Sequence, residues 1–307
     1  MVLHRVYKKK QLMVGSTGRK QRKKVFDWIN VVFMLIFAAM SVYPLIYVLA
    51  GSFNEGADYI TGGIYLFPRK FSLENYQVVV NDIRLWKSYG ITLARTILGT
   101  VSGVIFTAIV AFAMSRKSLL GRNWIYRFFI FTMFFGGGLI PYFWVINLLG
   151  LFHSFFVYSI PALFSAYNML VFVNFFKTIP EEIHESAVMD GASEFKIFFR
   201  IILPLSGPVI STIGLWIAVG HWNSFFDTMI YTSNNNLWTL QYYLMKVIKE
   251  SSMPAAGVSL PIELLEKIAP ETVSLAAIIV SVIPIFVLYP LILKTLTKGV
   301  VVGSLKG

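Results

Sequence analysis

Residues 28–50 read WINVVFMLIFAAMSVYPLIYVLA, a run of 23 residues without a charged side chain. At a rise of about 1.5 Å per residue, a helix of this length crosses the roughly 30 Å hydrocarbon layer of a bilayer. A cleavable signal peptide has an apolar run of only about 7 to 15 residues. The stretch therefore predicts a membrane-spanning helix that stays in the chain as an anchor.

The segment before this run is strongly basic. Nine of the first 24 residues are Lys or Arg, which is typical of a cytoplasmic tail beside anionic lipid. The net charge of +12 would also suit a nucleic-acid-binding protein. However, 56% of the 307 residues are hydrophobic and 14% charged, which leaves no soluble domain to present such a surface. We expect a lipid bilayer, and no nucleic acid, as the partner of this charge.

Five further apolar runs follow, so the fold class that we predict is an all-α integral membrane protein with six transmembrane helices. The expected spans are residues 28–50, 91–114, 125–149, 155–176, 208–230 and 273–293. The chain then divides into an N-terminal tail (residues 1–24), a six-helix transmembrane domain (residues 25–298) and a C-terminal tail (residues 299–307).

The distribution of Lys and Arg predicts the orientation. Loops on the side of the N-terminus hold 19 of these residues and the opposite loops hold seven. Because cytoplasmic loops carry the excess of positive charge, we expect both termini on the cytoplasmic side of a plasma membrane. The remaining cation, Arg95, lies near the outer end of the second span, and we expect its side chain to reach outward to water. The long outer loops, residues 51–90 and 231–272, are either docking surfaces for an external partner or plain connectors.

The most informative inner loop, residues 177–206, joins the fourth and fifth spans. Pro180 followed by Glu181 and Glu182 is typical of a helix N-terminus. Small residues near the end of this helix would let it lie in a groove of another protein. The three Phe residues at 195, 198 and 199 predict an amphipathic helix on the membrane, before two prolines redirect the chain. Acidic residues fit a protein partner better than membrane adhesion, although a helix pair that only ties two spans together stays an alternative.

The same loop resembles a known motif. It contains Glu185-Ser186-Ala187, three residues, Gly191, nine residues, Ile201, one residue and Leu203-Pro204. This resembles the EAA motif of binding-protein-dependent ABC importer permeases, with Ser186 in place of the central alanine. Further likeness at residues 62–68, 131–141, 220–224 and 303–307 points to carbohydrate permeases similar to the maltose-type G subunit, in the branch that handles complex oligosaccharides.

The resemblance implies a type I ABC importer, in which two homologous permeases combine with an ATPase subunit dimer and an extracellular solute-binding lipoprotein. The chain would be a non-catalytic permease subunit that imports a carbohydrate, here an oligosaccharide, by alternating access. The residues expected to couple it to the ATPase are Glu181, Glu182, Glu185, Ser186, Ala187, Asp190, Gly191, Ala192, Leu203 and Pro204.

The energy for transport is expected from outside the chain. ATP binding needs a Gly-rich phosphate loop that ends in Gly-Lys-Ser or Gly-Lys-Thr, and the sequence has no Gly-Lys pair. The spans hold few charged residues for ion coupling, Arg95 and Asp227 lying near the outer face. We expect no cofactor on this chain, ATP and magnesium on the partner ATPase, and no metal site, because there is no cysteine and the four histidines are scattered.

A sugar path needs aromatic rings that stack on pyranose rings and polar groups that bond their hydroxyls. His221, Trp222 and Asn223 in the fifth span, with Asn168 in the fourth, supply both. We predict that they line the path, the alternative being that they only bond neighbouring helices. The glycines at 136–138 predict a weak point in the third span, either a gate hinge or a close helix crossing.

Two other functions stay open at this point. A permease of the same superfamily with another solute, such as peptides or amino acids, would share the inner loop. A membrane-bound transferase would need catalytic acids or a His-Asp pair at the interface, whereas the acids here concentrate in residues 181–190.

Overall fold

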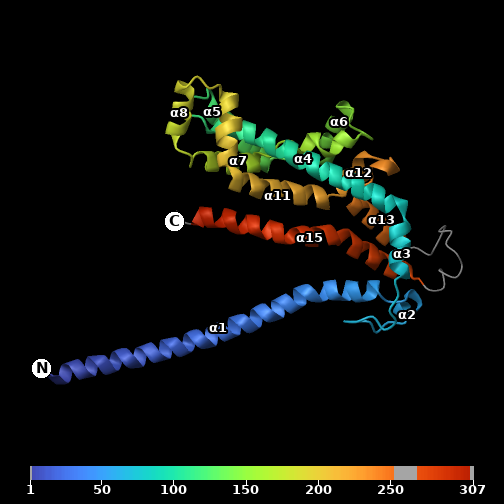
Figure 1. Ribbon diagram of the computed structural model, residues 1–307, viewed down its shortest axis with the longest axis horizontal. Coiled ribbons are helices and arrows are strands. Elements are labelled where there is room, and N and C mark those ends of the chain that lie inside the picture. The colour runs from blue at the N-terminus through green and yellow to red at the C-terminus, as the bar shows by residue number, and fades with distance from the viewer. Residues whose placement is uncertain (1, 252–267, 305–307) are drawn as a thin grey trace. The chain divides into compact units, whose positions relative to one another are not determined.

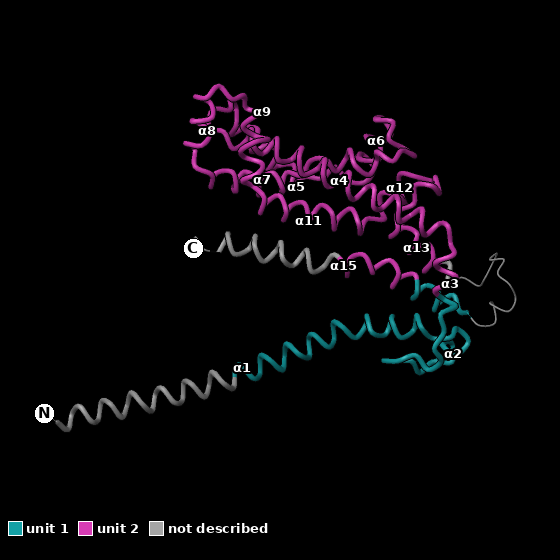
Figure 2. The backbone as a smooth tube through the Cα atoms, viewed as in Figure 1, with its two compact units in different colours: residues 1–75, 260–276 teal, residues 76–259, 277–307 magenta. Residues whose placement is uncertain are grey.

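The computed structural model describes residues 2–251 and 268–304 (Figure 1) and the side chains of residues 26–249 and 268–287. Within these ranges the regular secondary structure is helical, and an isolated antiparallel bridge joins Asn54 to Phe71. It divides into two compact units, residues 1–75 with 260–276, and residues 76–259 with 277–307 (Figure 2). The predicted all-α fold class is confirmed.

Three helices of the described residues are long and apolar enough to cross a membrane. They are Phe26–Ser52 of α1 (Val2–Ser52), α4 (Ile83–Ser115) and Pro270–Val287 of α15 (Pro270–Ser304). Three bent helix pairs raise the number to six if each pair forms one span. If each bent pair forms one span, the three long helices and the three pairs together make up the six predicted spans.

The bent pairs fall where the third, fourth and fifth spans are predicted. The third joins α5 (Arg122–Phe134) to α6 (Leu139–Leu148) at 117°. The fourth joins η1 (Phe155–Tyr158) and η2 (Ile160–Ala162) to α7 (Ala166–Phe176) at 47°. The fifth joins α9 (Glu194–Ile197), η3 (Phe198–Ile202) and α10 (Leu203–Leu205) to α11 (Gly207–Asn223) at 84°.

Two of these breaks coincide with residues that disfavour a continuous helix. The glycines at 136–138 separate α5 from α6, because glycine is a poor helix former. Pro208 lies in the first turn of α11, where its missing N–H is not needed. The weak point predicted in the third span is thus a complete break, and the chain turns before Pro208 as expected.

The first unit is built around the end of α1 and the segment after it. Asn75 at the start of α3 (Glu74–Asn81) donates from Nδ2 to the carbonyl oxygens of Ser52 at 3.0 Å and Asn54 at 2.8 Å. Thr272 in turn donates to Asn75 Oδ1 at 2.8 Å. This network, together with α2 (Gly56–Ile60), fixes the loop after α1. Residues 26–46 of α1 are all exposed, as expected of a helix surface that meets lipid or another chain.

The second unit is centred on α4, which packs against α7 and α11 (Figure 1). A Cβ atom at Gly99 would lie 2.3 Å from His221 Nε2, so only glycine allows this approach of α4 to α11. Near the far end of α4, buried Phe112 contacts Phe198 of η3, with ring centroids 5.3 Å apart. The Phe residues predicted to share one face therefore separate: Phe198 is in the core, and Phe195 and Phe199 are exposed.

Several helix boundaries differ from the predicted segment boundaries. The second span begins at Ile83 instead of residue 91, because Asp82 caps the helix by accepting from the Arg84 amide at 2.8 Å. The fifth ends at Asn223, since Ser224 is extended and α12 (Phe226–Tyr231) is a separate helix. The outer loop 231–272 contains η4 (Asn235–Leu237) and α13 (Leu240–Ser251), while its residues 252–267 lie outside the described residues. Residues 299–304 of the C-terminal tail belong to α15, and 305–307 lie outside the described residues.

Candidate functional site

The acidic segment of the inner loop forms a short helix, α8 (Glu181–Met189). Pro180 is its N-cap, with φ −55° and ψ 135°, and Glu181 and Glu182 occupy the first turn. Carboxylates at this position interact favourably with the positive end of the helix dipole. The helix start predicted at Pro180 is thus confirmed.

The C-terminus of α8 is closed by a Schellman motif around Gly191. The Gly191 amide donates to Val188 O at 2.9 Å, and the Ala192 amide donates to Ala187 O at 3.0 Å. This geometry requires a left-handed backbone, and Gly191 has φ +74°. A Cβ atom there would meet nothing within 4 Å. Among the described residues nothing crowds this position, so the backbone conformation is the reason for glycine.

Most of the α8 surface is exposed. Ala187 is the one buried residue of α8, and it belongs to the core cluster that contains Phe112 of α4 and Ile213 of α11. The side chains exposed around it are Glu181, Glu182, Ile183, Glu185, Ser186, Val188, Met189 and Asp190. The 88% exposure of Met189 leaves a large apolar side chain without a neighbour. An exposed surface of mixed apolar and acidic residues is typical of a protein-binding site.

The remaining residues of the motif lie farther along the loop. Ala192 is half-buried after α8. Leu203 and Pro204 belong to α10, directly before the 84° turn into α11, where Leu203 packs against the core. The structure therefore gives these two residues a place at the turn of the chain and not on α8.

Two ion pairs connect α8 to its surroundings. Lys117 Nζ lies 2.8 Å from Glu181 Oε2, which links α8 to the segment after α4. This hydrogen bond lowers the pKa of the Glu181 carboxyl and raises that of Lys117. His184 Nε2 lies 3.1 Å from Glu194 Oε1, which links α8 to α9. Lys117, Glu181 and Glu194 are exposed and His184 is half-buried, so these pairs orient α8 more than they stabilise the fold.

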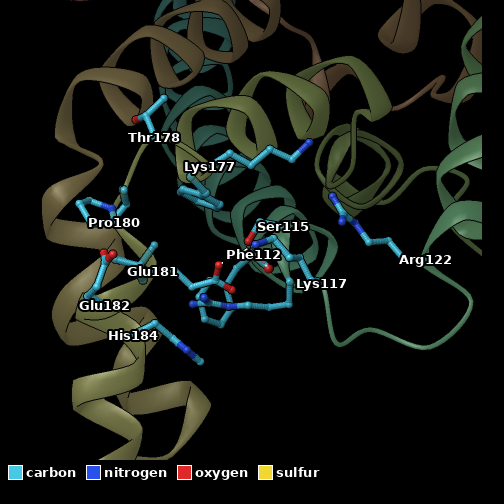
Figure 3. Close-up of a pocket in the computed structure, with 14 residues that line it drawn as sticks. Phe112, Ser115, Lys117, Arg122, Lys177, Thr178, Pro180, Glu181, Glu182 and His184 are labelled. Atoms are coloured by element: carbon cyan, nitrogen blue, oxygen red, sulfur yellow. Dashed lines mark hydrogen bonds and ion pairs between the residues drawn. The ribbon is translucent and has the colours of Figure 1, made fainter.

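A cavity of about 570 Å³ lies beside the start of α8 (Figure 3). Its lining comes from the ends of α4 and α7 and the starts of α5 and α8. The lining residues are Phe112, Ser115, Arg116, Lys117, Arg122, Phe176, Lys177, Thr178, Ile179, Pro180, Glu181, Glu182, His184 and Ile202. Basic side chains thus outnumber acidic ones in this cavity.

The second polar site of the structure is an ion pair buried among the spans. Arg95 of α4 is only 1% exposed, and its Nη2 donates to Asp227 Oδ2 at 2.7 Å. The guanidinium also lies 3.4 Å from His221 Nδ1 and 4.5 Å from the ring centroid of Tyr158. The prediction that Arg95 reaches outward to water is therefore wrong. A charge in an apolar bundle is stable when it is paired, and Asp227 supplies the opposite charge.

The residues predicted to line a sugar path lie in different surroundings. His221 is buried beside Arg95, and Trp222 is buried with its ring centroid 6.4 Å from that of Tyr89. Trp222 Nε1 has no hydrogen-bond partner among the described residues. Asn223 is exposed at the end of α11, whereas Asn168 is buried in α7. For His221 the geometry supports the alternative of helix packing, and the path itself stays a prediction. The Arg95–Asp227 pair was missed, although one opposite pair of charges in two apolar spans was a signal for it.

Comparison with known proteins identifies the class. The chain belongs to the family of inner membrane components of binding-protein-dependent transport systems, whose model matches residues 99–302. It is therefore a membrane-spanning permease subunit, as its resemblance to this family implied.

Individual relatives cover nearly the whole chain. Protein LplC of Bacillus subtilis is 35% identical over 285 residues, which cover 92% of this chain and 96% of that protein. The polygalacturonan/rhamnogalacturonan transport system permease protein YtcP of the same bacterium is 35% identical over 292 residues, covering 93% and 100%. A chain in the crystal structure of a bacterial ABC transporter involved in the import of the acidic polysaccharide alginate is 32% identical, with a TM-score of 0.81, covering 88% of this chain and 96% of that one.

Proposed function

We propose that this chain is the permease subunit of an ABC importer that carries an oligosaccharide across a bacterial plasma membrane. The observation that carries the proposal is α8, an acidic helix in the position of the EAA motif that buries only Ala187 in its own chain. Relatives that align over more than nine tenths of the chain include a permease named for polygalacturonan and rhamnogalacturonan, which supports a carbohydrate as the cargo. The alginate transporter supports the same cargo class.

The proposed transporter contains a second homologous permease, an ATPase dimer and an external solute-binding lipoprotein. ATP and magnesium bind to the ATPase, and this chain has no catalytic role. Both termini and α8 face the cytoplasm, consistent with the excess of Lys and Arg on that side. The exposed residues 26–46 of α1 are available for lipid or for the second permease.

The contacts of α8 suggest how ATP-driven motion reaches the spans. Ala187 shares a core cluster with Phe112 of α4 and Ile213 of α11, and the Lys117–Glu181 pair ties α8 to the end of α4. Because packed interiors resist deformation, a shift of α8 moves these helices with it. ATP binding then biases an equilibrium between inward-open and outward-open states.

The test is uptake of labelled oligosaccharides by cells that express the chain with an ATPase, a second permease and a binding protein from the same genome. Neutral oligosaccharides, uronate-containing oligosaccharides and peptides are compared. Uptake of an oligosaccharide that depends on this chain is expected. Uptake of peptides alone would replace the carbohydrate assignment by the alternative cargo.

The sugar path is tested by Trp222→Ala and Asn223→Ala in the same cells. We expect slower uptake with ATP hydrolysis retained, since these residues lie away from α8. Unchanged uptake in both variants would remove them from the path.

A further inference from the structure

Arg116, which directly follows α4, lies between two cavities. It lines the basic cavity beside α8 and also a second, apolar cavity of about 520 Å³. Its Nε atom is buried and has no hydrogen-bond partner in the part of the chain that the structure describes. The guanidinium carbon lies 4.3 Å from the ring centroid of Phe112, which holds the side chain in place. A buried donor without a partner is costly, so this geometry suits a ligand that brings an acceptor.

The basic cavity has an excess of positive charge. Its cations are Arg116, Lys117, Arg122 and Lys177, and its acids are Glu181 and Glu182. Lys117 is paired with Glu181, and Arg122 donates from Nε to Met114 O at 2.9 Å. No ion pair is formed by Arg116, Arg122 or Lys177 within residues 26–249 and 268–287. Three basic groups thus face one cavity with a single unpaired carboxylate, Glu182, which favours an anionic ligand.

The second cavity, here called the apolar groove, extends from Arg116 along the outside of α4. Ile109 and Ala113 lie one turn apart on its α4 wall, and the rest of the apolar lining is Phe112, Leu119, Leu120, Phe195 and Phe198. Its one carboxylate, Glu194, is paired with His184 at 3.1 Å. Ile109 and Ala113 belong to α4, a helix long and apolar enough to cross a membrane, so the groove connects a candidate span to the basic cavity at Arg116.

We propose that an anionic phospholipid binds here, with its phosphate at Arg116, Arg122 and Lys177 and an acyl chain in the apolar groove. An acidic side chain of a soluble partner would satisfy the basic cavity but would leave the groove empty. A phospholipid carries an anionic phosphate and an apolar acyl chain in one molecule, so it can place the phosphate in the basic cavity and the acyl chain in the adjoining apolar groove. Because it contacts the residues that flank α8, the lipid would hold α8 against α4. The role of α8 as the helix that contacts the ATPase is taken from the proposed function.

The experiment uses the complete transporter in nanodiscs of phosphatidylcholine that contain a minor fraction of phosphatidylglycerol with a photoreactive acyl chain. Labelled peptides are identified by mass spectrometry. The double variant Arg116→Gln with Lys177→Gln is compared with Lys196→Gln and Arg200→Gln, which remove the same charge from exposed positions of the same inner loop that line neither cavity. Ala113→Trp fills the groove, and Val101→Trp on the exposed surface of α4 is its control.

We expect labelling of peptides that contain Ala113, Leu119 or Phe195, reduced about fivefold for each basic residue removed from the cavity and unchanged in the control double variant. Ala113→Trp should reduce labelling and Val101→Trp should not. Equal labelling in both double variants would overturn the proposal, as would full competition by inorganic phosphate or cross-linking of Arg116 to an acid of the ATPase. Labelling is measured without transport, so a transporter that binds lipid here yet imports no oligosaccharide would refute the proposed function alone.

Discussion

Replacement of Gly191 tests two possible reasons for a glycine at the end of α8, a left-handed backbone and a lack of space for a side chain. The left-handed backbone at φ +74° costs an alanine about 1–2 kcal/mol, and Asn tolerates this conformation better. A Cβ atom meets nothing within 4 Å, so no steric cost within the chain is added. Gly191→Ala should therefore loosen the Schellman motif by about 1–2 kcal/mol, a factor of roughly 5–30 in the population of the open end. Gly191→Asn should loosen it less.

Hydrogen exchange of the Gly191 and Ala192 amides measures this directly, because both donate within the motif. We expect exchange about 5–30 times faster in Gly191→Ala, with the Asn variant in between. Gly191→Trp adds bulk on the surface that we assign to the ATPase, so it should also abolish uptake while membrane insertion persists. Equal exchange in all variants would refute the backbone argument, and full uptake by Gly191→Trp would refute the coupling assignment.

Three further predictions concern the contacts of α4 and α8. Asp227→Ala leaves Arg95 buried without its ion pair, so thermal unfolding of the purified protein should show that the free energy of unfolding falls by about 3–5 kcal/mol. A fall no larger than that of Asp190→Asn, on the exposed end of α8, would contradict the role of the pair. Gly99→Ala places a Cβ atom 2.3 Å from His221 and should cost about 1–3 kcal/mol, whereas Gly103→Ala, with its nearest atom at 3.4 Å, should cost less. The pKa of Glu181 is lowered, so the Lys117–Glu181 contact is present above the ordinary value of 4.5 and is lost as the pH falls through the lowered pKa. In Lys117→Met, the pKa of Glu181 followed by infrared spectroscopy of the carboxylate should rise toward 4.5. An unchanged pKa would show that the pair does not form.

The sequence was sufficient for the all-α membrane fold class and for the start of α8. Long uncharged runs such as residues 28–50 have one stable environment, and Pro180 with two following carboxylates defines a helix start whatever surrounds it. The break at the glycines and the turn before Pro208 were also predictable, because both follow from backbone preferences of single residues.

Features that depend on contacts between distant residues were not predictable in the same way. Arg95 and Asp227 are 132 residues apart, so only the packing of α4 against α11 and α12 reveals that they pair. The direction of Phe198 depends on Phe112 of α4 for the same reason. The sequence suggested small size as the purpose of Gly191, whereas its positive φ depends on hydrogen bonds that become visible only when the end of α8 is in place.

The central claim is that α8 contacts the ATPase on the cytoplasmic side. The chain has no cysteine, so Ser186→Cys introduces a single reactive thiol on the exposed surface of α8, and Val101→Cys on the exposed surface of α4 is the control. Cross-linking in intact cells should capture the ATPase from residue 186 and not from residue 101. Failure to capture the ATPase from residue 186 would contradict the claim. Modification of the thiol at residue 186 by a membrane-impermeant reagent added outside the cell would also contradict it.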